Sequence, residues 1–160
     1  MLSFSVARFT LILVLLLAVA AAPARADDAD LWATVNVCDT AAHPNEIGIR
    51  ASMPGGKAKG RLRMRFRVQY RDLAGGRWRS VRDADSGWQP IGRGRKQRES
   101  GWSFEVAGDG TQILRGVVTY RWTRGSGRIV RRARRITEVG HRSTVGADPP
   151  EFSAATCRIE

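Results

Sequence analysis

The sequence has few of the side chains that most often carry out catalysis. Its 160 residues include only two histidines, His43 and His141, and only two cysteines, Cys38 and Cys157. No serine lies in a nucleophile-elbow pattern, and no glycine-rich phosphate-binding loop is present. We therefore expect a protein that is not an enzyme, with an atypical hydrolase site around His141 as a remote alternative.

Metal ligands are equally scarce. Zinc prefers four nitrogen or sulfur ligands, and two cysteines without a nearby histidine pair fall short of that number. His141, Asp148 and Glu151 are ligands by residue type, but their spacing matches no known site. Asp83 and Asp85 lie close together, but such a pair in a loop is far more often solvated than catalytic. The sequence predicts neither a metal nor any other cofactor.

The long apolar run at the N-terminus predicts an export signal. Arg8 precedes residues 9–22, which are all apolar except Thr10. This run is too short for a membrane-spanning helix, which needs ~20 apolar residues. Ala24-Arg25-Ala26 then offers the small residues that a signal peptidase accepts. We expect a signal-peptide helix in residues 1–26, cleavage after Ala26 and secretion of residues 27–160 to the outer side of the cell envelope by a Sec-type route. An uncleaved membrane anchor is the alternative.

The two cysteines stand near opposite ends of the exported part. An even number of cysteines in an oxidising compartment favours a disulfide. A Cys38–Cys157 bridge would join the first strand to the last, and closing a loop of ~100 residues stabilises a fold by ~4–5 kcal/mol in the chain-entropy model. Two free thiols are the less favoured alternative.

Helical periodicity is nearly absent after residue 26, and period-two alternation dominates. Residues Arg61–Arg71 alternate most clearly, with Leu62 to Tyr70 apolar on one face and mostly arginine on the other. The run Leu114–Trp122 alternates in the same way, and in Arg128–Val139 the pattern slips near Arg131-Arg132, which indicates a bulge. Shorter candidate strands are Leu31–Cys38, Glu46–Met53, Arg77–Val81, Gly87–Ile91, Gly101–Val106 and Phe152–Ile159. Short strands separated by turns predict one all-β domain over residues 27–160, an antiparallel sandwich of about seven to nine strands.

Two segments resemble a known family. Phe66-Arg-Val-Gln-Tyr-Arg-Asp72 followed by Gly75-Gly-Arg-Trp78-Arg-Ser-Val81 resembles the central hairpin of fibronectin type III domains. Leu114 and Tyr120 are similar to that family's tyrosine-corner pattern. The resemblance implies an immunoglobulin-like sandwich that serves as a spacer or binding module, although the fold alone assigns no function. The order of motifs also resembles uncharacterised secreted proteins of actinobacteria.

The five tryptophans are Trp32, Trp78, Trp88, Trp102 and Trp122. We expect most of them to pack in the core or at a sheet edge, because a small domain needs large apolar side chains. Trp88 and Trp102 flank a charged loop, so a surface role in ligand stacking is the alternative for that pair.

Basic charge dominates the chain, and lysine supplies little of it. The net charge is +12, and lysine stands only at Lys57, Lys59 and Lys96. Removal of residues 1–26 would leave 25 basic and 15 acidic residues, a net charge of +10. Outward-facing residues of one strand are ~6.6–6.8 Å apart, so the Arg61–Arg71 strand predicts a row of guanidinium groups. The candidate polyanion-binding residues are Arg61, Arg63, Arg65, Arg67, Arg71, Arg93, Arg95, Lys96, Arg98, Arg115, Arg121, Arg131, Arg132, Arg134 and Arg135.

Two functions follow from this composition. In the first, a secreted sandwich binds an anionic polysaccharide, another envelope polymer or lipid headgroups through the arginine face, since guanidinium groups suit phosphate, sulfate and carboxylate. In the second, the protein is a structural or protein-interaction module whose arginines only solvate the sheet. Nucleic acid is the least expected polyanion for an exported protein, and no nucleic-acid motif is present.

Overall fold

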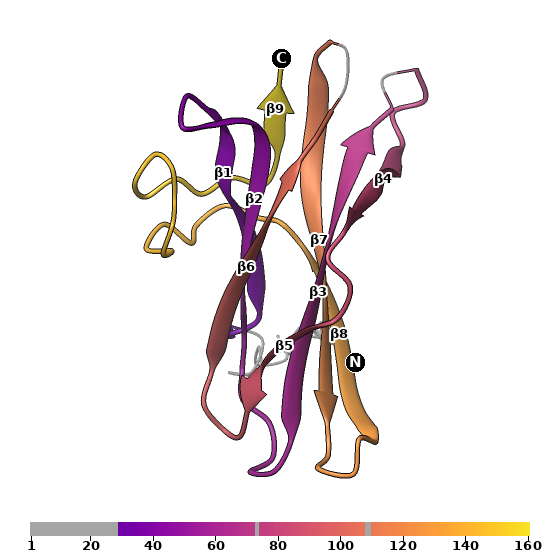
Figure 1. Cartoon of the computed structure of the whole chain (residues 1–160), viewed down its shortest axis with the longest axis vertical. Coiled ribbons are helices and arrows are strands. Elements are labelled where there is room, and N and C mark those ends of the chain that lie inside the picture. The colour runs from indigo at the N-terminus through magenta and orange to yellow at the C-terminus, as the bar shows by residue number, and fades with distance from the viewer. Residues whose placement is uncertain (1–28, 73, 108–109) are drawn as a thin grey trace, which may run out of the picture.

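The computed structural model describes residues 29–72, 74–107 and 110–160 (Figure 1). The predicted signal peptide, residues 1–26, and the cleavage site after Ala26 lie outside the described residues. Among the residues described, no helix has the length and apolar character needed to cross a membrane.

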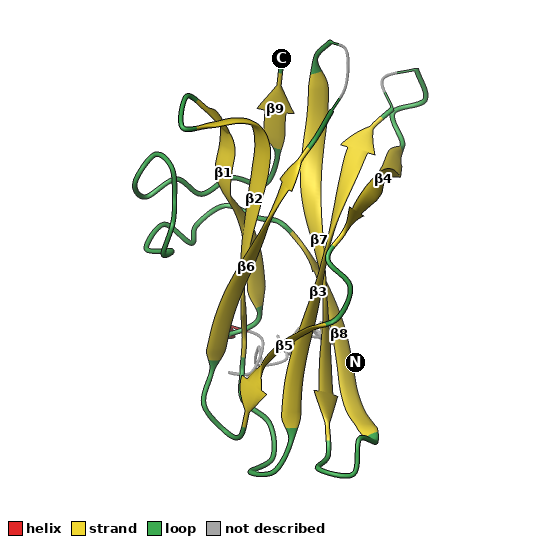
Figure 2. Cartoon of the chain, viewed as in Figure 1, coloured by secondary structure: helices red, strands yellow, loops and turns green. Residues whose placement is uncertain are grey.

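Two antiparallel sheets make up the described part of the chain (Figure 2). The three-stranded sheet has the order β1-β2-β6, with β1 at Trp32–Thr40, β2 at His43–Met53 and β6 at Arg98–Glu105. The six-stranded sheet has β3 (Arg61–Arg71) and β7 (Gln112–Thr123) at its centre. Four shorter strands flank these two: β4 (Trp78–Asp85), β5 (Gln89–Arg93), β8 (Ile129–Ile136) and β9 (Cys157–Ile159).

Each edge of the six-stranded sheet is shared by two short strands. Along β3, residues 61–64 pair with β5 and residues 67–71 pair with β4. Along β7, residues 112–114 pair with β9 and residues 117–123 pair with β8. The predicted all-β sandwich is therefore confirmed, whereas its immunoglobulin-like character stays a prediction.

The core lies between the sheets and follows the predicted alternation. Leu62, Met64, Phe66 and Val68 of β3 are at most 1% exposed, and the apolar residues of β2 that face them are equally buried. Burying such side chains stabilises the fold by ~1.5–3 kcal/mol each. The sheets approach closely at Gly116 of β7, where an added Cβ would lie 2.8 Å from the Ile49 Cδ1 atom. A glycine at this position lets the two sheets pack together.

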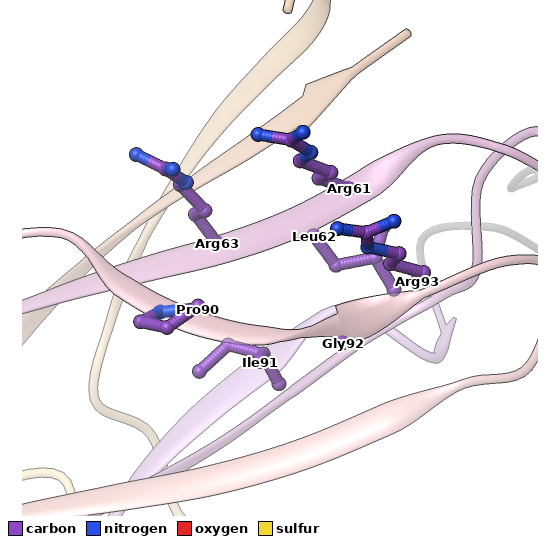
Figure 3. Close-up of a pocket in the computed structure, with 7 residues that line it drawn as sticks. All are labelled: Arg61, Leu62, Arg63, Pro90, Ile91, Gly92 and Arg93. Atoms are coloured by element: carbon purple, nitrogen blue, oxygen red, sulfur yellow. The ribbon is translucent and has the colours of Figure 1, made fainter. Parts of the chain in front are cut away.

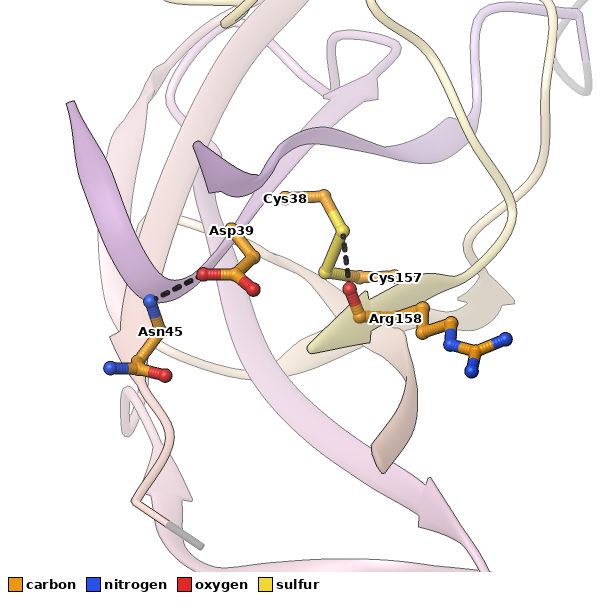
Figure 4. Close-up of a disulfide and its surroundings, with 5 residues drawn as sticks. All are labelled: Cys38, Asp39, Asn45, Cys157 and Arg158. Carbon is orange, nitrogen blue, oxygen red and sulfur yellow. Dashed lines mark hydrogen bonds between the residues drawn. A yellow bond between two sulfur atoms is a disulfide. The ribbon is translucent and has the colours of Figure 1, made fainter. Parts of the chain in front are cut away.

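A disulfide joins the two sheets at one end of the sandwich (Figure 4). Cys38 lies in β1 and Cys157 begins β9, and their Cα atoms are 5.4 Å apart. The predicted bridge is confirmed. Its cysteines are 119 residues apart, and closing such a long loop lowers the entropy of the unfolded chain more than closing a short one.

The segment between β8 and β9 runs along β1, on the side away from β2. Val35 and Ala154 exchange two backbone hydrogen bonds of 2.9 and 3.0 Å, and the Glu138 amide donates to the Ala33 carbonyl at 2.8 Å. This segment covers part of an otherwise open strand edge, which limits edge-to-edge aggregation.

The predicted strands agree with the observed ones apart from their ends. β4 extends to Asp85 and β6 begins at Arg98, so part of the region expected to be loop is strand. The last strand is shorter than predicted and begins at Cys157. The predicted bulge is confirmed: the register between β7 and β8 shifts between Arg131 and Ile129, which leaves Val130 as the extra residue.

Candidate anion-binding face

The face of the six-stranded sheet that points away from the core carries the predicted arginine rows. On β3 these are Arg61, Arg63, Arg65, Arg67 and Arg71, which alternate with the buried residues. In the sheet register, Arg63 lies opposite Arg121 of β7, and Arg121 lies opposite Arg132 of β8. The sheet therefore merges the rows of three strands into one basic surface, here called the arginine face.

Two predicted members on β8 do not belong to this face. Arg131 lies opposite Trp122, with its guanidinium carbon 4.6 Å from the centroid of that ring. Arg135 lies opposite the buried Val118, and its Nε donates to the Leu31 carbonyl at 3.1 Å. Strand alternation turns these two side chains toward the core side of β8, whereas Arg132 and Arg134 are exposed on the arginine face.

The predicted basic loop is divided between the two sheets. Arg93 ends β5 and lies opposite Arg61, so it joins the arginine face. Arg98 begins β6 and pairs with Met53 in the three-stranded sheet. Arg95 and Lys96 are exposed in the loop between these strands. The structure thus separates Arg98 from the predicted surface.

At one end of the arginine face the arginines have partners within the sheet. Arg65 forms an ion pair with Asp85 of β4, with Nε 2.8 Å from Oδ1. Arg115 donates to Gln69 Oε1 at 3.0 and 2.8 Å. Arg67 donates to Thr119 Oγ1 at 3.3 Å. We call this region the paired end. It consists of β4 and the parts of β3 and β7 nearest to it, with Arg65, Arg67, Gln69, Asp85, Arg115 and Thr119.

These contacts change the acidity of the groups involved. Hydrogen bonding from Arg65, with a smaller contribution from the Gly87 amide, holds the pKa of the Asp85 carboxyl below its ordinary value. Partial burial, with repulsion from Arg134, lowers the pKa of the Arg115 guanidinium. At the paired end, Asp85 therefore neutralises the charge of Arg65, while Arg67 and Arg115 hydrogen-bond to neutral side chains.

At the other end, in the lower half of Figure 1, arginines meet each other instead. This open end consists of Arg61, Arg63, Arg93, Arg121 and Arg132. Within the described ranges, none of these five side chains forms an ion pair with a carboxylate. The pKa of the Arg121 guanidinium is lowered by its partial burial and by repulsion from Arg132, Arg63 and Arg65.

Two hollows meet at Arg61 and Arg63. The larger, about 370 Å³, lies between β3 and β5 and includes Arg93 (Figure 3). The smaller, about 150 Å³, lies between β3, β7 and the β7–β8 turn and includes Arg121. Neither hollow has a carboxylate among its lining residues, all of which belong to the described part of the chain.

Sequence reasoning missed the role of two tryptophans. Trp78 of β4 lies opposite Arg71 of β3, and the Arg115 guanidinium carbon is 4.1 Å from the centroid of the Trp78 ring. The guanidinium of Arg121 stacks on Trp88 at 3.8 Å. Trp32 and Trp122 are buried, and Trp78 is partly buried on the edge strand β4, so core or edge packing is confirmed for these three. Core packing is wrong for Trp102, which is 41% exposed, and Trp88 is only partly buried. Trp78 and Trp88 each stack on an arginine of β7 that is more than 30 residues away in the sequence, so no local sequence pattern could have predicted these two contacts.

Of the groups considered for chemistry, Asp85 is the ion-pair partner of Arg65 on the arginine face, and the two histidines have other neighbours. His141 stacks on Trp32 with ring centroids 4.2 Å apart, and its Nε2 is 3.3 Å from Glu138 Oε1. His43 lies 3.3 Å from Glu46. Among the described residues, no three His, Cys, Asp or Glu side chains gather as a metal-binding group.

Comparison with known proteins adds no assignment. No protein family, no curated protein and no solved structure matches this chain significantly. The arginine face therefore has to be interpreted from its own geometry.

Proposed function

We propose that this protein is an exported, non-enzymatic β-sandwich module that binds anionic polymers through the open end of its arginine face. The observation that carries the proposal is the cross-strand register of like charges. Arg61 lies opposite Arg93, and Arg63, Arg121 and Arg132 follow one another across three strands.

This arrangement is unfavourable for the isolated protein. Like charges directly opposite each other in a sheet destabilise it, by about 0.2–1 kcal/mol per pair. The Nε atom of Arg121 is also buried without a hydrogen-bond partner among the described residues. A bound polyanion would neutralise the charges and supply acceptors, and the surface would concentrate such a ligand by electrostatic steering.

Arginine is well suited to such a ligand. Its planar guanidinium presents five N–H donors in a fixed fork and stays charged at all relevant pH values. The predicted export would bring the face to anionic polysaccharides and other envelope polymers. Of the predicted partners, these polymers fit best, because the open end extends over several strands rather than enclosing a single headgroup.

The alternative function, a structural or protein-interaction module, finds support in the paired end. There the guanidinium groups hold the sheet together and cover it, as ordinary surface arginines do. At the open end Arg121 stacks on Trp88, but the side chains of Arg61, Arg63 and Arg93 form no ion pair or hydrogen bond among the described residues. These three arginines are the part of the face that favours ligand binding.

The test is retention of the purified protein on immobilised dextran sulfate across a salt series. We expect binding that weakens log-linearly with salt concentration, by counterion release. The variant Arg61→Glu/Arg63→Glu/Arg93→Glu should lose retention. The matched control is Arg71→Glu/Arg77→Glu/Arg82→Glu, which makes the same charge change at exposed positions near the paired end.

The control should retain most of the binding because its charges lie outside the open end. Equal losses in both variants would show attraction by net charge alone. No retention of the native protein at moderate salt would overturn the proposed function.

A further inference from the structure

We infer that the hollow between β3 and β5 is a site for one tetrahedral oxyanion, a phosphate or sulfate group of the polymer, and that the polymer then crosses the strands instead of following β3. This inference rests on the proposed function and adds to it the anchoring group and the direction of the bound chain.

The hollow is formed by an irregularity in β5. Arg61 lies opposite Arg93 and Arg63 lies opposite Pro90, so β5 takes three residue steps where β3 takes two. Gly92, at a φ of 152°, lies within this bulge. A β-bulge re-aims the side chains that follow it. In a regular strand Pro90 and Arg93, which are three residues apart, would point to opposite faces. The bulge thus brings Arg93 onto the arginine face.

The three guanidinium groups around this hollow lie on the same side of the two strands (Figure 3). Arg61 and Arg93 are exposed, and Arg63 is partly exposed. Leu62, which alternates with them, is buried in the core. The site therefore has three cations from two strands at its solvent side, and Leu62, Pro90, Ile91 and Gly92 complete its lining.

The number and placement of these donors favour a tetrahedral anion. A phosphate or sulfate ester offers three acceptor oxygens that point in different directions, and each can meet one arginine. A carboxylate has two oxygens in one plane, which a single guanidinium fork satisfies. Three arginines around one hollow thus select for phosphate or sulfate over carboxylate.

The neighbouring charges set the direction of the chain. Across the strands, Arg63 is followed by Arg121 and Arg132, over two strand spacings of ~4.8 Å each. The smaller hollow, which Arg61 and Arg63 share with Arg121, continues in that direction. Along β3, Arg65 already holds Asp85 and Arg67 holds Thr119. A polymer following β3 would have to displace these contacts, whereas one crossing the sheet meets cations that form no ion pair with a carboxylate among the described residues, although Arg121 stacks on Trp88.

The experiment compares a small anion with a polymer on three single variants. Sulfate and acetate are titrated by NMR, at constant ionic strength set with chloride, and dextran sulfate is titrated across a salt series. Arg93→Gln should weaken sulfate binding at least ~10-fold, because one of three charge-assisted contacts is lost. Arg132→Gln should leave sulfate binding unchanged and reduce the polymer's salt slope by roughly 0.7–0.9, the value for one lost contact. Arg71→Gln, the matched control at the paired end, should change neither.

The outcomes separate this inference from the proposed function. If the native protein binds dextran sulfate but not sulfate, or binds acetate as tightly as sulfate, the tetrahedral site is wrong and polymer binding stands. If Arg71→Gln lowers the salt slope as much as Arg132→Gln, the crossing direction is wrong. If dextran sulfate does not bind at all, both fail. Thermal unfolding of each variant identifies any loss that comes from misfolding.

Discussion

The two ends of the arginine face use the same residue type on the same strand for different purposes. At the paired end, Arg65 meets Asp85 and Arg115 meets Gln69 and Trp78. At the open end, Arg61 meets Arg93 and Arg63 meets Arg121. The side chains alternate identically along β3 in both halves. The difference comes from the neighbouring strands, because β4 brings an acid to the face and β5 brings a third arginine.

This comparison shows what a row of like charges means in a sheet. Charges that hydrogen-bond to neighbours need no ligand, since the protein itself satisfies them. Charges that face only one another raise the free energy of the folded state until an anion binds. Each of the four predictions below changes one end to resemble the other, or separates the two ends by a measurement.

The largest effect is expected from placing an acid in the open end. Pro90 is exposed and lies opposite Arg63, as Asp85 at the paired end lies opposite Arg67 and forms its ion pair with the neighbouring Arg65. Pro90→Glu should weaken dextran sulfate binding about 10-fold, a change of ~1.4 kcal/mol, because Arg63 gains an internal partner. The cross-strand pair should also raise the free energy of unfolding by roughly 0.2–1 kcal/mol.

Pro90→Gln is the matched control, since it removes the same proline without adding charge. It should bind the polymer nearly as the native protein does. If Pro90→Gln loses as much affinity as Pro90→Glu, the proline and not the charge balance controls the open end.

The second effect concerns the tryptophan at each end. Trp88 stacks on Arg121 of the open end, and Trp78 stacks on Arg115 of the paired end. Replacing either by alanine should lower the free energy of unfolding by about 1 kcal/mol or somewhat more, from the lost cation–π contact and packing, as measured by urea denaturation. Only Trp88→Ala should also weaken polymer binding, because Arg121 belongs to the open end and Arg115 does not.

Phenylalanine at each position tests the assignment, since a smaller ring keeps part of the stacking. Trp88→Phe should recover part of both stability and polymer affinity. If Trp78→Ala changes polymer affinity as much as Trp88→Ala, the two ends do not act separately.

The sequence predicted the strands far better than the function of the face. Alternation alone was enough to orient Leu62, Met64 and Phe66 inward, and the two cysteines were enough to predict their bridge. The sequence could not reveal that Arg65 forms an ion pair and Arg63 does not, because this depends on whether β4 or β5 lies beside the residue. The β5 bulge at Gly92 and the stacking of Trp88 on Arg121 likewise depend on pairing between distant segments.

The third prediction opens the paired end. Asp85→Asn should cost roughly 0.2–1 kcal/mol of unfolding free energy, because a partly exposed ion pair is lost. It should also strengthen dextran sulfate binding severalfold, since Arg65 then joins the unpaired cations. Both quantities are measured with the urea and salt-series assays described above.

Asp83→Asn is the control, because Asp83 is an exposed acid two residues away on the same strand and asparagine tolerates its positive φ of 64°. It removes the same charge but frees no arginine, so its effect on polymer binding should be smaller. Equal effects from the two variants would mean that net charge, not pairing, distinguishes the ends.

The smallest effect is a pH dependence confined to the paired end. The pKa of Asp85 is lowered by its hydrogen bond from Arg65, and the pKa of Asp72 is lowered by its hydrogen bond from Arg79. A carboxyl whose pKa is lower in the folded state stabilises the fold fully above its unfolded pKa of ~3.9. That contribution is lost as the pH falls through the folded pKa, when the unfolded state already holds the proton. The melting temperature of the native protein should therefore exceed that of Asp85→Asn at pH 7, and the two should converge once the pH falls below the folded-state pKa of Asp85. Pro90→Gln should stay parallel to the native protein over the same range, because it removes no titrating group. A constant difference between the native protein and Asp85→Asn down to the lowest pH would show that Asp85 stabilises the paired end through packing and not through its charge.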